Sequence, residues 1–162
     1  MVISRSFALA HDANTPGDGV RWVNIDSIDS SAYSSDGPFR VAGFKTNWSS
    51  YLVLQTVFPR SSVSSVDLNL HVIAGVGTKI YSVSTACLTY GSSTAASNPT
   101  YNSSQSATAS SSFLTFSEVV ITPLTLTGCS AGKYLYVKIA NTGGTDTSYE
   151  AMAIDAELVF HP

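Results

Sequence analysis

Residues 148–160 read SYEAMAIDAELVF, and this stretch decides between a helical and a β-sheet fold. Glu, Ala, Met and Leu are good helix formers, so residue propensity alone favours a helix. The larger apolar residues, however, recur at every second position, which places them on one face of an extended strand: Met152, Ile154, Ala156, Leu158 and Phe160. On a helix, at about 100° per residue, they would scatter around the axis. Burying a Leu or Phe side chain is worth about 1.5–3 kcal/mol, whereas propensities differ by at most about 0.7 kcal/mol per residue, so the pattern predicts a strand.

The same alternation recurs along the whole chain. In VDLNLHV, residues 66–72, four apolar side chains share one face, and in YLYVKIA, residues 134–140, Leu135, Val137 and Ile139 do so. Strands are predicted at residues 2–9, 20–25, 39–44, 51–58, 66–73, 79–90, 113–121, 134–140 and 149–160. Gly and Pro turns separate them, and no segment shows a helical period with caps. The pattern therefore predicts a single all-β domain, residues 1–162, with about eight or nine strands.

One segment differs in composition from the rest. Residues 91–112, GSSTAASNPTYNSSQSATASSS, consist almost entirely of Ser, Thr, Ala and Asn, and Tyr101 is their only large side chain. Such a segment offers little to bury. We therefore expect an exposed loop outside the core.

Charge and cysteine content exclude several classes of partner. Lys and Arg number 8, are dispersed along the chain and leave a net charge of −3, which argues against nucleic-acid binding. No apolar run approaches the length of a membrane span, so no membrane insertion is expected. Cys87 lies in a predicted strand and Cys129 in a turn bounded by Gly. Two reduced, structural thiols are the favoured interpretation, and one disulfide bridge is the alternative.

The sequence contains no recognisable catalytic or metal-binding motif. There is no G-x-S-x-G, and the three histidines, His11, His71 and His161, are far apart. His71 lies on the polar side of a predicted strand, and we expect it to be solvated or in an interface rather than catalytic. Residues 11–19 are rich in Asp, Asn and Gly but lack the closing Glu of a calcium loop. We assign no catalytic, metal or cofactor-binding residue and expect a protein that is not an enzyme.

Candidate contact residues are the exposed aromatic side chains and their neighbours. We single out Trp48, Tyr90, Tyr101 and Asn102. Aromatic side chains of β proteins lie more often in cores and interfaces than on sugar-binding platforms. A platform for glycans is therefore the secondary interpretation of these residues.

Two parts of the sequence carry a family resemblance. Towards the C-terminus, ITPLTLT (121–127) is followed by GKYLYVKI (132–139), a polar turn (141–148) and a closing strand (151–160). Upstream, VFPR (57–60) precedes the alternating strand VDLNLHV. This order resembles small β-sandwich domains in the virion proteins of tailed bacteriophages, including head fibres, decoration proteins and tail fibres. The resemblance covers residues 54–160 and implies no catalytic residues.

From the pattern and the resemblance we expect a single antiparallel β-sandwich of jelly-roll type. Its expected function is that of a non-enzymatic structural protein on the virion surface, assembled in the host cytoplasm. A capsid decoration or head-fibre subunit is the favoured assignment. One alternative is a tail-fibre or receptor-binding tip, and another is a carbohydrate-binding module.

The expected partners follow from the edges of such a sandwich. The predicted strands at 2–9 and 113–121 each carry one charged residue, Arg5 and Glu118, whereas exposed edges are usually protected by charges, prolines or bulges. A second subunit would cover these edges, so we expect a homo-oligomer, and phage surface domains of this kind favour a trimer. Other expected partners are virion proteins such as the major capsid protein and a glycan of the host surface.

Overall fold

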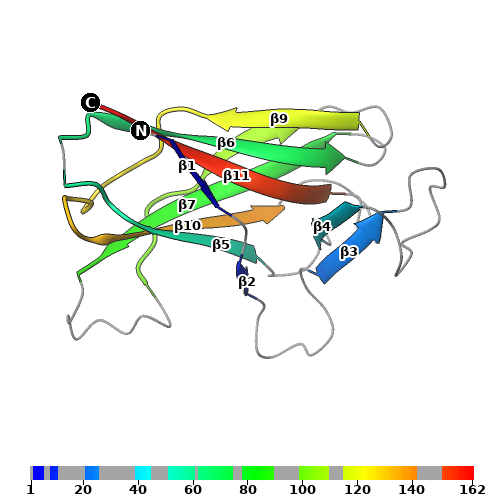
Figure 1. Cartoon of the computed structure of the whole chain (residues 1–162), viewed down its shortest axis with the longest axis horizontal. Helices are drawn as coiled ribbons and strands as arrows, with labels where there is room; N and C mark the ends of the chain where they lie inside the picture. Colours follow the sequence, from blue (N-terminus) through cyan, green and yellow to red (C-terminus); the bar gives the residue numbers. More distant parts are fainter. Residues whose placement is uncertain are drawn as a thin grey trace.

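The computed structural model describes the backbone of residues 2–5, 8–10, 21–25, 39–44, 51–60, 62–74, 78–89, 99–109, 115–141 and 151–162. Within these ranges the chain forms eleven strands and no helix, which confirms the all-β prediction (Figure 1). The strands are β1 (Val2–Arg5), β2 (Ala8–Ala10), β3 (Arg21–Ile25), β4 (Phe39–Phe44), β5 (Tyr51–Val57), β6 (Ser65–Ala74), β7 (Lys79–Leu88), β8 (Gln105–Ala109), β9 (Thr115–Ile121), β10 (Tyr134–Asn141) and β11 (Ala151–His161).

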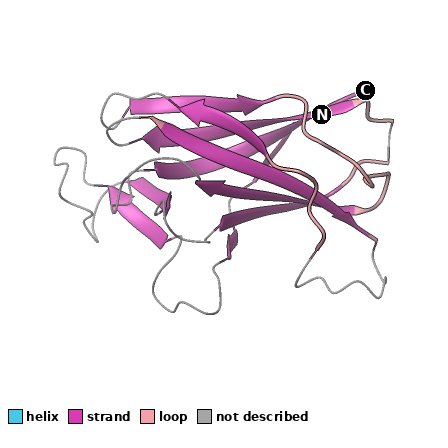
Figure 2. Cartoon of the chain, turned by 180° about the vertical axis from the view of Figure 1, so that it is seen from behind, coloured by secondary structure: helices cyan, strands magenta, loops and turns pink. Residues whose placement is uncertain are grey.

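The strands form two antiparallel sheets that pack as two layers (Figure 2). The six-stranded sheet has the order β3-β4-β11-β6-β9, with β1 paired to β11, and the five-stranded sheet has the order β2-β5-β10-β7-β8. The pairs are nested: β7 pairs with β8, β6 with β9, β5 with β10 and β4 with β11. The strands β4 to β7 therefore pair with β8 to β11 in reverse order, as in one long hairpin. Successive pairs alternate between the two sheets.

The core lies between the sheets and is built from the alternating strands. Val66, Leu68, Leu70 and Val72 of β6 are fully buried, as the sequence pattern predicts. Leu135, Val137 and Ile139 of β10 are likewise buried from the opposite sheet. In the six-stranded sheet, Ala156, Leu158 and Phe160 of β11 are buried beside the β6 residues. The Phe160 ring packs edge to face against the Phe58 ring, with 5.7 Å between the ring centres. The inward faces of these strands are thus confirmed.

Each predicted strand overlaps an observed one, but one predicted strand is divided into two and another contains a shift in its pairing register. The predicted strand at residues 2–9 is divided, because β1 pairs with β11 in one sheet while β2 pairs with β5 in the other. In β11 the pairing with β6 shifts between Ala153 and Asp155, so the uninterrupted alternation expected from Met152 to Phe160 does not hold across Ile154. Such a bulge inserts one extra residue and resets the faces of a strand.

The segment 91–112 is not a simple exposed loop, contrary to the prediction. Its residues 105–109 form β8, which pairs with β7 at one edge of the five-stranded sheet. Ala109 is buried in the core and Ala107 packs against it. Because Gln105 is followed only by Ser, Ala and Thr, apolar and polar positions differ little in this strand, and the sequence shows no clear alternation. Residues 91–98 and 110–112 lie outside the described part of the chain.

The preference for two reduced thiols is also wrong. Cys87 at the end of β7 and Cys129 in the link between β9 and β10 form a disulfide, with 5.0 Å between their Cα atoms. The two residues are 42 positions apart in sequence, and only the pairing of the strands brings them to a separation that a disulfide can span. Both half-buried cysteines pack against the core.

Candidate functional site

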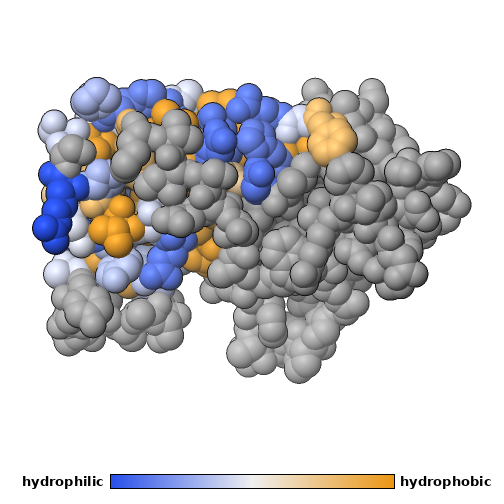
Figure 3. Space-filling model, in the orientation of Figure 1, coloured by the Kyte–Doolittle hydropathy of each residue, from blue (hydrophilic) through white to orange (hydrophobic). Residues whose placement is uncertain are grey.

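The outer face of the six-stranded sheet carries carboxylates over β6, β9 and β11. All carboxylate side chains that the structure describes project from it: Asp67 on β6, Glu118 on β9, and Asp155 and Glu157 on β11. They face outwards because they alternate with the buried residues of the same strands. Figure 3 shows hydrophilic side chains gathered over β6, β9 and β11 on this face.

A shallow hollow lies on this face where the three strands meet. The register places His71 of β6 between Glu118 of β9 and Asp155 of β11. Its Nδ1 is hydrogen-bonded to the Asp155 carboxylate, and its Nε2 lies 3.8 Å from Glu118 Oε1. The hollow has a volume of ≈ 360 Å³ and is also lined by Phe116, whose residue surface is 59% exposed.

The chemistry of the hollow suits a positively charged group. Two carboxylates supply negative charge, and an exposed phenyl ring can take part in a cation–π contact. Both ring nitrogens of His71 are directed at carboxylates, whereas a catalytic triad needs one of them to face a nucleophile. The geometry therefore favours binding of a cation over nucleophilic chemistry at His71.

A second group of polar residues, around Asp67, ties the end of the chain to the sheet. Thr122 Oγ1 donates to Asp67 Oδ1 at 2.6 Å, and His161 Nε2 lies 2.8 Å from Oδ2. The hydrogen bond from Thr122 lowers the pKa of Asp67, His161 lowers it further, and burial acts in the opposite direction. Because the Ser64 N–H also donates to the His161 carbonyl at 2.9 Å, this group has a structural role.

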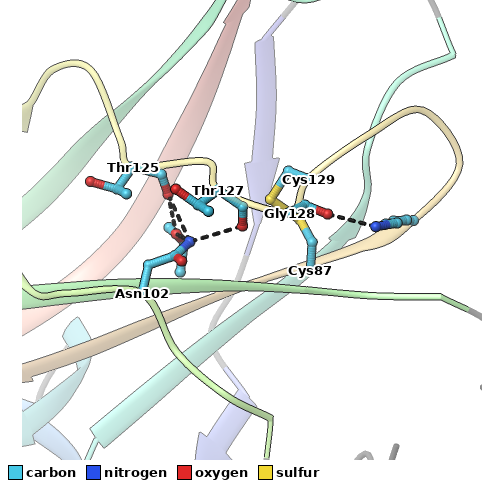
Figure 4. Close-up of a disulfide and its surroundings, with 8 residues drawn as sticks. Cys87, Asn102, Thr125, Thr127, Gly128 and Cys129 are labelled. Atoms are coloured by element: carbon cyan, nitrogen blue, oxygen red, sulfur yellow. Dashed lines mark hydrogen bonds between the residues drawn. A yellow bond between two sulfur atoms is a disulfide. The ribbon is translucent and has the colours of Figure 1, made fainter. Parts of the chain in front are cut away.

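The disulfide belongs to a larger set of contacts that we call the clasp: Thr85, Cys87, Asn102 and Gln105, together with residues 122–129. Figure 4 shows its central part, the disulfide with Asn102, Thr125, Thr127 and Gly128. The Asn102 amide donates to the Thr125 and Thr127 carbonyls at 3.4 and 3.2 Å and to Thr85 Oγ1 at 3.1 Å. The Asn102 N–H also donates to the Thr85 carbonyl, at 2.8 Å. Asn102 thus joins three segments of the chain.

Gln105 and Gly128 complete the clasp. The Gln105 amide donates to the Pro123 carbonyl at 2.8 Å and accepts from the Thr125 N–H at 2.7 Å. Gly128 has φ +81°, a backbone conformation that favours glycine, directly before Cys129. Lys133 Nζ donates to the Gly128 carbonyl at 2.7 Å. The link between β9 and β10 is therefore fixed at both ends by side chains of β7, β8 and the segment before β8.

The outer face of the five-stranded sheet has a different character. Tyr134, Tyr136 and Lys138 alternate with the buried residues of β10 and point away from the core. Tyr101 lies on the same side, and Lys138 Nζ is 5.3 Å from the centre of its ring. Among the described residues, this face thus presents tyrosines together with Lys138.

The candidate contact residues separate into three groups. Tyr101 lies half-exposed on the tyrosine-rich face, and the side chain of Asn102 is hydrogen-bonded within the clasp. Trp48 and Tyr90 lie outside the described residues. Sequence reasoning missed Tyr134 and Tyr136, although the alternation in YLYVKIA already placed them outwards. It also missed the hollow, because Asp155 is 84 residues from His71 in the chain.

Comparisons with known proteins give no family for this chain. No protein-family model matches it, and no curated protein matches it significantly. Among the described residues, no group of three or more His, Cys, Asp or Glu side chains is arranged to hold a metal ion. The same part of the chain contains no helix long and apolar enough to span a membrane.

Proposed function

We propose that the chain is a jelly-roll domain that serves as a non-enzymatic structural protein on the outside of a phage particle. The observation that carries the proposal is the nested pairing of β4 to β11, with innermost pair β7·β8 and outermost pair β4·β11. A hairpin of eight strands folded over in this way gives two four-stranded sheets, the arrangement of a jelly roll. Jelly rolls are common in viral capsid proteins and lectins.

Two further observations support a surface role. The disulfide fits a protein that works outside the reducing cytoplasm, as a released particle does, and the bridge would then form after assembly. The resemblance of residues 54–160 to virion β-sandwich domains points to the same class. Within that class, a capsid decoration or head-fibre subunit is the favoured assignment, and we expect a homo-oligomer, most simply a trimer.

Density-gradient purification of particles from cells that express the gene, followed by mass spectrometry, tests this proposal. The chain should co-sediment with the major capsid protein at a fixed ratio through repeated gradients. Recovery only in the soluble fraction, with none in the particle band, would reject the virion assignment.

A carbohydrate-binding module is the second candidate, and the tyrosine-rich face favours it. Tyr101, Tyr134 and Tyr136 share one side of the five-stranded sheet, where flat rings can stack on sugars. Binding of the purified protein to a glycan array, abolished by Tyr136→Ala and retained by Phe116→Ala on the opposite face, would favour this function. Glycan binding by this face would equally suit a receptor-binding tip of a tail fibre.

A further inference from the structure

We propose that the hollow on the six-stranded sheet is a binding site for the Arg60 side chain of a second copy of this chain. The inference rests on the proposed function only through the expectation that the protein forms a homo-oligomer. It names the contact by which the copies recognise each other, which neither the fold nor the resemblance supplies.

The shape and chemistry of the hollow select a guanidinium group. Glu118 and Asp155 place carboxylates on opposite sides of His71, with the exposed Phe116 ring at the rim. A guanidinium is planar, can donate two parallel hydrogen bonds to a carboxylate and stacks on aromatic rings. An ammonium group offers only the charge.

Among the cations whose side chains the structure describes, Arg60 is the best-placed donor. None of the four Lys and Arg side chains that the structure describes lies on β6, β9 or β11, the strands that carry the carboxylates. Lys79 is only 2% exposed, Lys138 lies over the Tyr101 ring and Lys133 donates to Gly128. Arg60 is exposed in the link between β5 and β6, and so is the described cation best placed to reach another molecule.

Arg60 of the same molecule cannot occupy the hollow. It precedes β6, whereas His71 lies six residues into that strand, about 20 Å from Ser65 at the usual rise per residue. In Figure 1 the link between β5 and β6 and the start of β9 are at opposite ends of the sandwich. The contact is therefore between molecules. It is reciprocal in a two-fold dimer, or it runs from the end of one copy to the face of the next and closes into a ring when the rotation permits, as the expected trimer requires.

Exposed apolar side chains beside the hollow support a protein partner. On β9, Phe116 and Val120 flank Glu118 and are 59% and 46% exposed. Grouped exposed apolar residues beside charges are typical of protein interaction sites, and arginine and aromatic residues are enriched among the side chains that dominate binding energy. The exposed β9 edge would be covered by the same contact.

A charge reversal measured by sedimentation velocity at micromolar concentration tests the proposal. Glu118→Arg and Arg60→Glu should each weaken self-association by at least about thirtyfold, the effect of removing one partner of a buried charge pair. The double variant should restore association to within about threefold of the original protein, because the pair is re-formed with reversed charges. Glu157→Arg and Lys138→Glu are the matched controls, since neither residue lines the hollow, and circular dichroism verifies that every variant folds.

Three results would overturn the inference, while the virion assignment is tested separately by the particle experiment. One is a protein that stays monomeric at the highest soluble concentration. Another is an oligomer that Glu118→Arg and Arg60→Glu leave intact, which places the contact elsewhere. Loss of association in both single variants without recovery in the double variant would likewise reject a direct pair and indicate a different cationic partner surface.

Discussion

The clasp and the hollow are both polar groups on the same sandwich, yet they are built differently. In the clasp, the Asn102 amide and the Gln105 amide are satisfied by backbone groups of the same chain, and a disulfide adds a covalent tie. In the hollow, half-exposed carboxylates surround a histidine beside Phe116, which is 59% exposed. The clasp therefore stabilises the fold, whereas we propose that the hollow binds a partner. Variants of the clasp should change stability, and variants of the hollow should change association.

Removing the disulfide should have the largest effect on stability. In Cys87→Ser/Cys129→Ser the unfolded chain regains the entropy of a loop closed over 42 positions, worth about 4 kcal/mol in the chain-entropy account. Chemical denaturation measures the loss, and sedimentation velocity near neutral pH should show unchanged self-association of the folded fraction. A loss of association at full folding would break the distinction between the two groups.

Asn102→Ala should come next. The substitution leaves the Thr125 and Thr127 carbonyls and the Thr85 hydroxyl without the amide, at a cost of about 1–3 kcal/mol. Urea denaturation gives the value, and Ser103→Ala, at the exposed neighbouring position, is the control. Equal stability of the two variants would show that the clasp depends on the disulfide alone.

Asp67 should give a smaller effect that depends on pH. Because its pKa in the folded protein is lowered, chiefly by Thr122, the ionised carboxylate contributes stability above the pKa of the unfolded chain. This contribution is lost as the pH falls from the usual range of an aspartate carboxyl through the lowered pKa of the folded protein. Asp67→Asn should therefore flatten this part of the stability profile, measured by thermal melting across pH. A variant that loses stability as steeply as the original protein would contradict the role of Asp67.

Glu118→Gln should change stability least. The side chain is 51% exposed and lies 3.8 Å from the His71 ring, so its removal should alter the free energy of unfolding by less than about 0.5 kcal/mol. Self-association should nevertheless weaken, because the hollow loses one carboxylate. If melting changes strongly while association does not, Glu118 belongs with the structural groups and the comparison fails.

The strands and their inward faces could be predicted from sequence, whereas the two polar groups could not. Alternation over β6 and β10 correctly identified buried residues such as Leu68 and Leu135, because a two-residue period is a local property. The disulfide and the hollow depend on which strands are neighbours. His71 meets Asp155 only because β6 pairs with β11. β8 was missed because its Ala, Ser and Thr residues hardly differ in polarity.

The proposed place of the chain on the outside of a phage particle is tested most directly by immunogold electron microscopy of intact purified particles. Antibodies raised against the folded recombinant protein should label the outer surface of the particles, at the capsid for a decoration or head-fibre subunit and at the tail tip for a receptor-binding domain. Intact particles that remain unlabelled, while the same antibodies detect the protein free in the lysate, would contradict the proposal.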